Sequence, residues 1–188
     1  MLLRSPAMTR YLRLFCIAAV LGGNVLSASA QTTERGTPAV GGDIGILFPD
    51  EAFENTVTLD AFGELFLTPR ISARGMLAWA SPGITGQTED HFRQFKLLFN
   101  GVYNWDFDEW RPFATAGAGV YFVRLHLDGR PDPEGETRGG LNFGGGVEYF
   151  AWDQMSIKSE LRWDVVSDPP GLPDATGLSL TFGVKRYF

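Results

Sequence analysis

The chain has 188 residues and a single cysteine, Cys16, which lies inside an apolar run near the N-terminus. Arginines precede this run, and the small residues SASA follow it. That order is typical of a secretory signal peptide, so we expect residues 1–30 to be a signal peptide that is cut after Ala30. The remaining chain, 31–188, then has no cysteine, which excludes disulfides and thiolate sites.

Positive charge and long hydrophobic runs are also scarce. Three of the 16 Lys and Arg residues lie in the expected signal peptide, which leaves 13 bases against 22 acids and a net charge of −9. An acidic chain without a basic stripe is a poor partner for nucleic acid. No later stretch approaches the ~18 consecutive apolar residues of a transmembrane helix. We therefore expect no nucleic-acid partner and no transmembrane helix after residue 31, and the alternative to the signal peptide is an N-terminal membrane anchor, for which the apolar run is shorter than the ~20 residues that span a bilayer.

Alternation of apolar and polar residues is what the chain has in abundance. Eight segments show this period of two, which is typical of strands: 40–48, 56–67, 70–80, 92–105, 111–124, 139–150, 155–165 and 176–188. Strands in soluble proteins cluster near 5–6 residues, whereas a tilted strand that crosses a bilayer needs about 9–11. The pattern predicts an all-β fold, an eight-stranded antiparallel up-and-down transmembrane β-barrel that occupies 31–188 as a single domain.

The connections between these segments alternate in length. The short ones are 68–70, 106–111 and 151–154, and the mostly longer ones, rich in Pro, Gly and acids, are 49–55, 81–91, 125–138 and 166–175. Outer-membrane barrels have short periplasmic turns and longer external loops. We therefore expect an outer-membrane location, four external loops, and both termini in the periplasm.

Alternation alone does not say which face is buried, because a soluble lipocalin-like barrel shares the period and inverts the faces. The polar faces of the eight segments hold six acids and five bases, while the surplus acid lies in the connections. An enclosed interior needs such a balance, because unpaired charge away from water is costly. We therefore place the apolar face against lipid and expect an interior charge network of Asp60, Glu64, Arg74, Lys96, Glu148, Lys158, Glu160 and Arg162.

The five tryptophans all lie at the ends of predicted strands. Indole rings favour membrane interfaces, where the ring is in an apolar region and its N–H meets water. We expect an aromatic girdle made of Trp79, Trp105, Trp110, Trp152 and Trp163.

Three stretches carry a family resemblance. RPFATAGAGVYF and LNFGGGVEYF resemble glycine-containing strands of the eight-stranded outer-membrane β-barrel family, which includes the OmpA transmembrane domain and OmpX. We expect their glycines to relieve crowding in strongly coiled strands. The terminal LSLTFGVKRYF resembles the C-terminal aromatic signal that the outer-membrane insertion machinery recognises in that family. The resemblance spans roughly residues 38–188 and implies outer-membrane lipids and the barrel insertion machinery as partners. It also implies an assembly signal formed by Phe182, Val184, Tyr187 and Phe188.

Candidate chemistry is sparse. The only histidines, His91 and His126, lie at loop edges without the Ser pattern of lipid A deacylases and without further ligands at metal spacing. We expect no catalytic, metal or cofactor site. A barrel of eight strands is just wide enough to be filled by side chains, which argues against a general porin.

The leading interpretation is a monomeric, non-enzymatic integral outer-membrane protein with a structural or surface-interaction role, whose external loops contact an unknown ligand. Three alternatives stay open at this point. The chain could be a narrow channel or carrier for a small apolar solute, as in OmpW-like barrels. It could instead be a lipid A-modifying enzyme or a soluble secreted carrier with inverted faces.

Overall fold

The computed structural model describes residues 33–49, 54–82, 91–107, 109–126, 135–167 and 176–188. The expected signal peptide lies outside these residues. The described chain forms eight strands: β1 (Pro38–Pro49), β2 (Thr56–Phe66), β3 (Ile71–Ala80), β4 (His91–Asn104), β5 (Trp110–His126), β6 (Glu136–Trp152), β7 (Met155–Val166) and β8 (Gly177–Tyr187).

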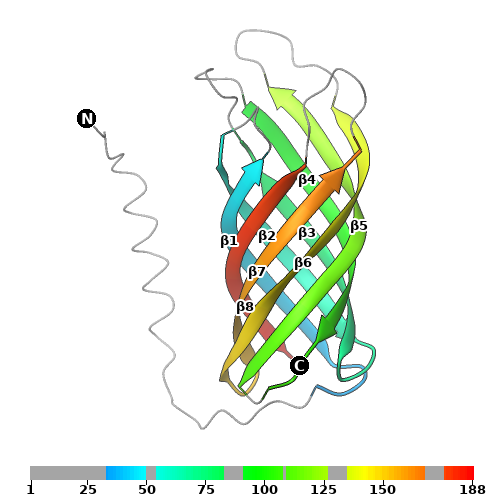
Figure 1. Cartoon of the computed structure of the whole chain (residues 1–188), viewed down its shortest axis with the longest axis vertical. Coiled ribbons are helices and arrows are strands. Elements are labelled where there is room, and N and C mark those ends of the chain that lie inside the picture. Colours follow the sequence, from blue (N-terminus) through cyan, green and yellow to red (C-terminus); the bar gives the residue numbers. More distant parts are fainter. Residues whose placement is uncertain (1–32, 50–53, 83–90, 108, 127–134, 168–175) are drawn as a thin grey trace, which may run out of the picture.

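Each strand pairs antiparallel with its neighbours in sequence, and β1 pairs with β8 to close the barrel (Figure 1). The closing ladder runs from Ala39 opposite Tyr187 to Pro49 opposite Gly177. The predicted fold, an eight-stranded antiparallel up-and-down barrel, is confirmed. Closure gives every strand two partners, so the sheet has no open edge that would leave backbone groups unpaired in lipid.

The strand boundaries differ from the predicted ones most clearly around β5 and β6. The predicted loop 125–138 is too long, because β5 continues to His126 and β6 starts at Glu136. The Gly- and charge-rich composition of residues 136–139 favours a loop, but cross-strand pairing with 120–123 holds them in the sheet. The loops 49–55, 81–91 and 166–175 likewise lose single residues, Pro49, His91 and Val166, to strands.

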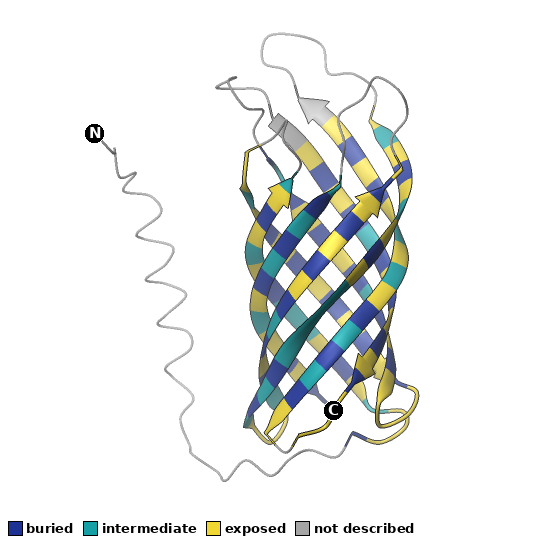
Figure 2. Ribbon diagram, viewed as in Figure 1, coloured by how far each residue is buried: buried dark blue, intermediate teal, exposed yellow. Residues whose placement is uncertain are grey.

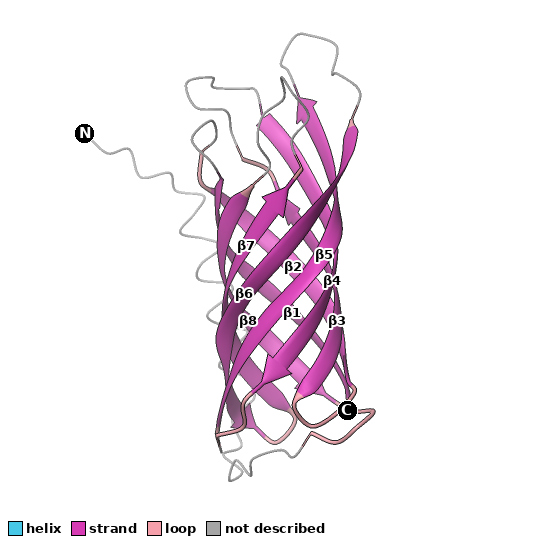
Figure 3. Cartoon of the chain, turned by 45° about the vertical axis from the view of Figure 1, so that its right-hand side comes forward, coloured by secondary structure: helices cyan, strands magenta, loops and turns pink. Residues whose placement is uncertain are grey.

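The barrel has two different ends, which Figure 3 shows from a second direction. The turn end is the end where residues 67–70, 105–109 and 153–154 connect the strands, and the C-terminus lies there. The loop end is the opposite end, where β1 connects to β2, β3 to β4, β5 to β6 and β7 to β8. Within the described ranges, no helix is long and apolar enough to cross a membrane.

Burial alternates residue by residue along the strands (Figure 2). On β7, the pattern is strict: Ser156, Lys158, Glu160, Arg162 and Asp164 are buried, while the intervening large apolar side chains are exposed. The polar face therefore points into the lumen and the apolar face outward, as predicted from charge balance. A soluble barrel would show the reverse arrangement.

Two inward glycines of β6 show why the GGG stretch is needed. A Cβ built on Gly144 would come within 2.3 Å of the backbone oxygen of Leu161, and one on Gly146 within 2.0 Å of that of Ser159. Both contacts are with backbone, which a side-chain rotation cannot relieve. The absence of a side chain therefore allows β6 and β7 to coil closely around the lumen.

Candidate functional site

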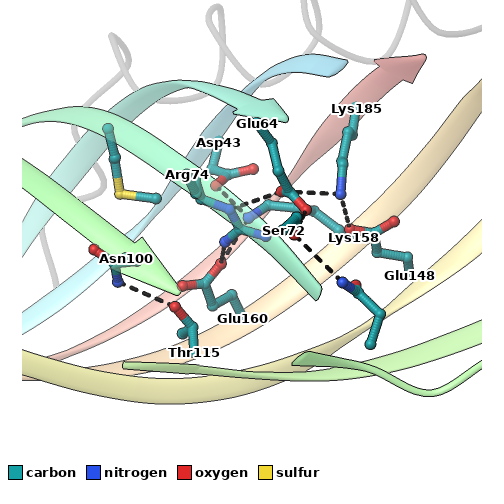
Figure 4. Close-up of polar contacts among 12 residues, drawn as sticks. Asp43, Glu64, Ser72, Arg74, Asn100, Thr115, Glu148, Lys158, Glu160 and Lys185 are labelled. Carbon is teal, nitrogen blue, oxygen red and sulfur yellow. Dashed lines mark hydrogen bonds and ion pairs between the residues drawn. The ribbon is translucent and has the colours of Figure 1, made fainter. Parts of the chain in front are cut away.

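The lumen is crossed by an ion network centred on Arg74 of β3 (Figure 4). Its Nε donates to Oε2 of Glu64 on β2 at 2.9 Å, and its Nη1 donates to Oε2 of Glu160 on β7 at 2.7 Å. The guanidinium also lies over the rings of Phe62 and Phe113, 5.0 and 5.2 Å from their centroids. One cation thus joins two walls of the barrel.

Strand β7 supplies the common side of this network. Its inward residues alternate in sign, because Lys158, Glu160, Arg162 and Asp164 are spaced by two and strand residues of one parity share a face. Each one reaches a different strand, and the shortest of these contacts are Lys158–Asp43 of β1 (2.9 Å), Glu160–Arg74 of β3 (2.7 Å), Arg162–Asp60 of β2 (3.0 Å) and Asp164–Lys96 of β4 (2.5 Å). The barrel is therefore cross-tied through its interior from β7 to the four strands β1 to β4.

A second group of contacts lies towards the turn end. Glu148 accepts from Lys185 Nζ at 2.8 Å and from the hydroxyl of Tyr187. The guanidinium of Arg111 lies 4.7 Å from the ring centroid of Phe150 and 5.9 Å from that of Tyr187. These side chains fill the lumen near the turn end.

Apolar side chains complete the filling on either side of the ions. Phe62, Met76, Leu98, Tyr121, Val123 and Val166 form one buried cluster, and Ala39, Phe66, Phe150 and Tyr187 form the other. Strands β4 and β5 also contribute neutral polar side chains to the lumen. One example is Asn100 of β4, which donates a hydrogen bond to the hydroxyl of Thr115 on β5 at 3.0 Å. Along the barrel axis, the lumen is thus filled by the ionic groups and by an apolar cluster on either side of them.

All eight residues of the predicted interior network are buried in the lumen and form ion pairs with one another or with Asp43, Asp164 and Lys185. Sequence reasoning missed two more buried bases, Arg111 and Arg138. Arg111 is the first residue of the predicted strand 111–124, and Arg138 is the last residue of the predicted loop 125–138. Their parity is the signal that could have found them: Arg111 is in phase with inward Phe113 and Thr115, and Arg138 with inward Asn142.

The tryptophans lie on the outer face at two levels. Trp105, Trp110 and Trp152 are at the turn end, whereas Trp79 and Trp163 are near the loop end, and all five are exposed. Several pack against other aromatic rings, as Trp163 does by stacking on Phe143 at 6.1 Å. Between the two levels the large exposed side chains are aliphatic residues and Phe, such as Leu77, Leu161 and Phe99.

The four residues of the predicted assembly signal do not share a face. Phe182, Val184 and Phe188 are exposed on the outside, but Tyr187 is fully buried in the lumen. Tyr187 has the inward parity of Lys185, and its hydroxyl bonds to Glu148. The outer apolar surface of β8 therefore consists of Leu178, Leu180, Phe182 and Val184, and Phe188 extends it just beyond the strand.

The two histidines become neighbours in the sheet, because His91 of β4 pairs in register with His126 of β5. Their side chains lie outside the described residues. Among the side chains that are described, no group of three or more His, Cys, Asp or Glu is arranged to hold a metal ion.

A family model for the outer membrane protein beta-barrel domain matches residues 16–185. The chain belongs to this outer-membrane β-barrel family. The protein is therefore a transmembrane β-barrel of the outer membrane, and its exposed apolar face meets membrane lipids. No curated protein matches the chain closely enough in sequence to count as a relative.

Solved structures of similar shape support the fold. Neisserial surface protein A matches with a TM-score of 0.65 at 12% identity, over 81% of this chain and 96% of its own. The N-terminal barrel domain of OprF from Pseudomonas aeruginosa matches with a TM-score of 0.61 at 12% identity, over 83% of this chain and 100% of its own. OprG from the same organism matches with a TM-score of 0.65 at 10% identity, over 84% and 98%. At these identities the likeness concerns the fold alone.

Proposed function

We propose that this outer-membrane barrel is a closed, non-enzymatic and monomeric scaffold that holds its external connections at the cell surface, where they contact an external ligand. The carrying observation is the set of cross-lumen ion pairs from β7 to β1, β2, β3 and β4. Because the lumen is filled in this way, we expect the loop end, and not the interior, to bind the external ligand. Buried pairs of this kind resist separation, because removing one partner leaves a charge uncompensated.

The narrow-channel alternative makes a different demand on the lumen. A conducting path would have to pass Arg74, whose guanidinium is bonded to Glu64 and Glu160 and packed against two rings. Opening such a path would break the two charge-assisted hydrogen bonds from Arg74 to Glu64 and Glu160 at the same time. The closed scaffold needs no such rearrangement.

Conductance in planar bilayers tests the closed lumen. The refolded wild-type protein should give no current steps above the lipid baseline, because ions are excluded by the paired charges. Mass analysis of lipid A after incubation with the same protein should show no change in acyl or head-group composition. Stable current steps would favour the channel instead, and a shifted lipid A mass would favour the enzyme.

We further propose that the outer surface formed by Phe182 and Val184 of β8 and by Phe188, which follows the strand, is the assembly signal for the barrel insertion machinery. Phe188 offers an exposed ring, and its backbone N–H donates to the carbonyl of Pro38 at 3.0 Å, which ties the chain to β1. The ring and the backbone bond are separate contributions that substitutions can distinguish.

Replacing Phe188 with alanine removes the ring and keeps the backbone bond to Pro38. The folded outer-membrane fraction in cells, measured by the heat-modifiable gel shift, should fall, while refolding into detergent micelles in vitro should be unchanged. Phe188→Trp, which keeps an aromatic ring, is the matched control and should assemble as wild type does. Normal assembly of Phe188→Ala would show that the ring is not part of a recognition signal.

A further inference from the structure

A groove of about 390 Å³ opens on the outer face at the loop end, across strands β3 to β6. Most of its lining comes from residues of outward parity: Trp79, Arg93, Phe95, Phe122, Arg124 and Thr137. Its floor is aromatic, with the Phe95 and Phe122 rings 6.0 Å apart. Its upper part, nearer the loop end, carries two arginines.

These two arginines are an unfavourable pair on their own. Arg93 of β4 lies directly opposite Arg124 of β5 in the ladder, one step of the outer face beyond the Phe95–Phe122 pair. Like charges directly opposite each other destabilise a sheet. Among the residues that the structure describes, no acid forms an ion pair with either arginine, and the groove's one carboxylate, Glu136, pairs with Arg138 at 3.0 Å.

The side chain of Arg124 is placed by its contact with the start of β6. Its guanidinium lies over Gly135, where a Cβ would come within 3.3 Å of Nε. Arg124 therefore extends along the outer face towards Gly135, the residue before β6. An anion that contacts both side chains would replace the repulsion of these opposed cations with two charge-assisted interactions.

The depth of the site in the membrane indicates which anion fits. Trp79 marks the aromatic belt near the loop end, and long basic side chains beside such a belt extend towards the head groups. Short turns face the periplasm and long loops the outside, so the loop end lies in the outer leaflet. The arginines are therefore at head-group level, and Phe95 and Phe122 are at the level where acyl chains begin.

We propose that this groove binds an outer-leaflet lipid through a phosphate on its head group. Arg93 and Arg124 clamp the phosphate, and the start of an acyl chain lies on Phe95 and Phe122. Guanidinium groups bind phosphate with two parallel hydrogen bonds, so two of them suit a phosphate better than a single negative carboxylate. The site lies on the lipid-facing surface, outside the closed lumen, and does not depend on what the external loops contact.

The test uses the full-length barrel in phosphatidylcholine nanodiscs doped with lipid A that carries its phosphates, or with the same lipid A after phosphatase treatment. Native mass spectrometry after transfer to detergent counts the lipid that stays bound. Wild type should retain the phosphorylated form and lose the dephosphorylated one. The double variant Arg93→Gln/Arg124→Gln should lose roughly tenfold or more in retention, because each charge-assisted bond contributes strongly to affinity.

Matched controls separate the groove from general charge. Arg35→Gln/Arg70→Gln removes two exposed arginines from the turn end and should bind as wild type does. Arg93→Lys/Arg124→Lys keeps the charge and should recover part of the retention. The heat-modifiable gel shift verifies folding, and the comparison of the two lipid A forms on wild type tests the proposal even if the double variant does not fold.

Three outcomes would overturn the lipid site. Equal retention of both lipid A forms by wild type would show that phosphate is not recognised. Equal loss in the turn-end control would show a non-specific charge effect. Displacement of the lipid by inorganic phosphate at equal concentration would assign the arginines to a free anion rather than to a lipid.

Discussion

Replacing Arg162 with methionine is expected to lower the free energy of unfolding of the barrel by about 3–5 kcal/mol. Arg162 is fully buried, and its Nη2 lies 3.0 Å from Oδ2 of Asp60. This is the one ion pair of Asp60 within the described part of the chain. Methionine keeps much of the volume of the arginine stem, so the loss reports a stranded carboxylate rather than a cavity. Urea unfolding in phospholipid vesicles measures it.

A second substitution at the partner should recover part of this loss. Asp60→Asn removes the uncompensated charge. It also keeps a side-chain oxygen that can accept the hydrogen bond that the Thr58 hydroxyl donates to Asp60 Oδ1 at 3.0 Å in the wild-type structure. Residues in one network show coupling energies of about 0.5–3 kcal/mol in double-mutant cycles. We therefore expect Arg162→Met/Asp60→Asn to be more stable than Arg162→Met alone.

The exposed turn residue Arg70 provides the control. Arg70→Met removes the same charge at the surface and should change the free energy of unfolding by no more than about 0.5 kcal/mol. Additive effects of the substitutions at positions 162 and 60 would contradict the cross-tied lumen. The interior charges would then be solvated independently.

The fold was predictable from the sequence because two local signals agree. The period of two in MSIKSELRWDVV defines both faces of β7 without any knowledge of its neighbours, and the length of the alternating segments points to a bilayer. Charge balance then decides which face is inside, because an enclosed lumen cannot hold surplus acid. The period and the length are read from each strand separately, whereas the charge balance is a sum over all eight.

The partners within the lumen were not predictable in the same way. Arg162 and Asp60 are 102 residues apart and meet only because the barrel closes and its register is fixed around all eight strands. Register depends on the turns, and a slip of one residue would reverse a face. The sequence therefore indicates that acids and bases meet, but not which ones.

The arginine pair on the outer face was missed for a related reason. Arg93 and Arg124 both lie within predicted strands, but their alignment depends on the register of β4 with β5 around the turn at 105–109. For Tyr187, by contrast, the sequence does contain the signal, because Tyr187 has the same parity as the inward-facing Lys185. Grouping Tyr187 with the other aromatic residues of the last strand overlooked this spacing. The assembly signal was predicted from residue type, whereas spacing by two would have assigned Tyr187 to the lumen.

Arginine at position 161 should destabilise the barrel by about 2–4 kcal/mol in a bilayer, the cost of placing this side chain at the midplane on the lipid face. Leu161 lies in the middle of β7, opposite Leu180 of β8 and Gly145 of β6, and 48% of its surface is exposed. In a soluble protein that exposure would face water, and Leu161→Arg would be tolerated. In the outer membrane it faces hydrocarbon, where a guanidinium must reach towards a distant interface to remain hydrated.

Val165 of the same strand and the same face is the matched control, because it lies next to the loop end. Val165→Arg should cost only about 0–1 kcal/mol, since the charge there reaches the interface directly. Reversible unfolding in phospholipid vesicles measures both variants. If both variants lost the same free energy of unfolding, the cost of a charge on the outer face would not depend on its depth. That result would contradict contact between this face and the hydrocarbon core.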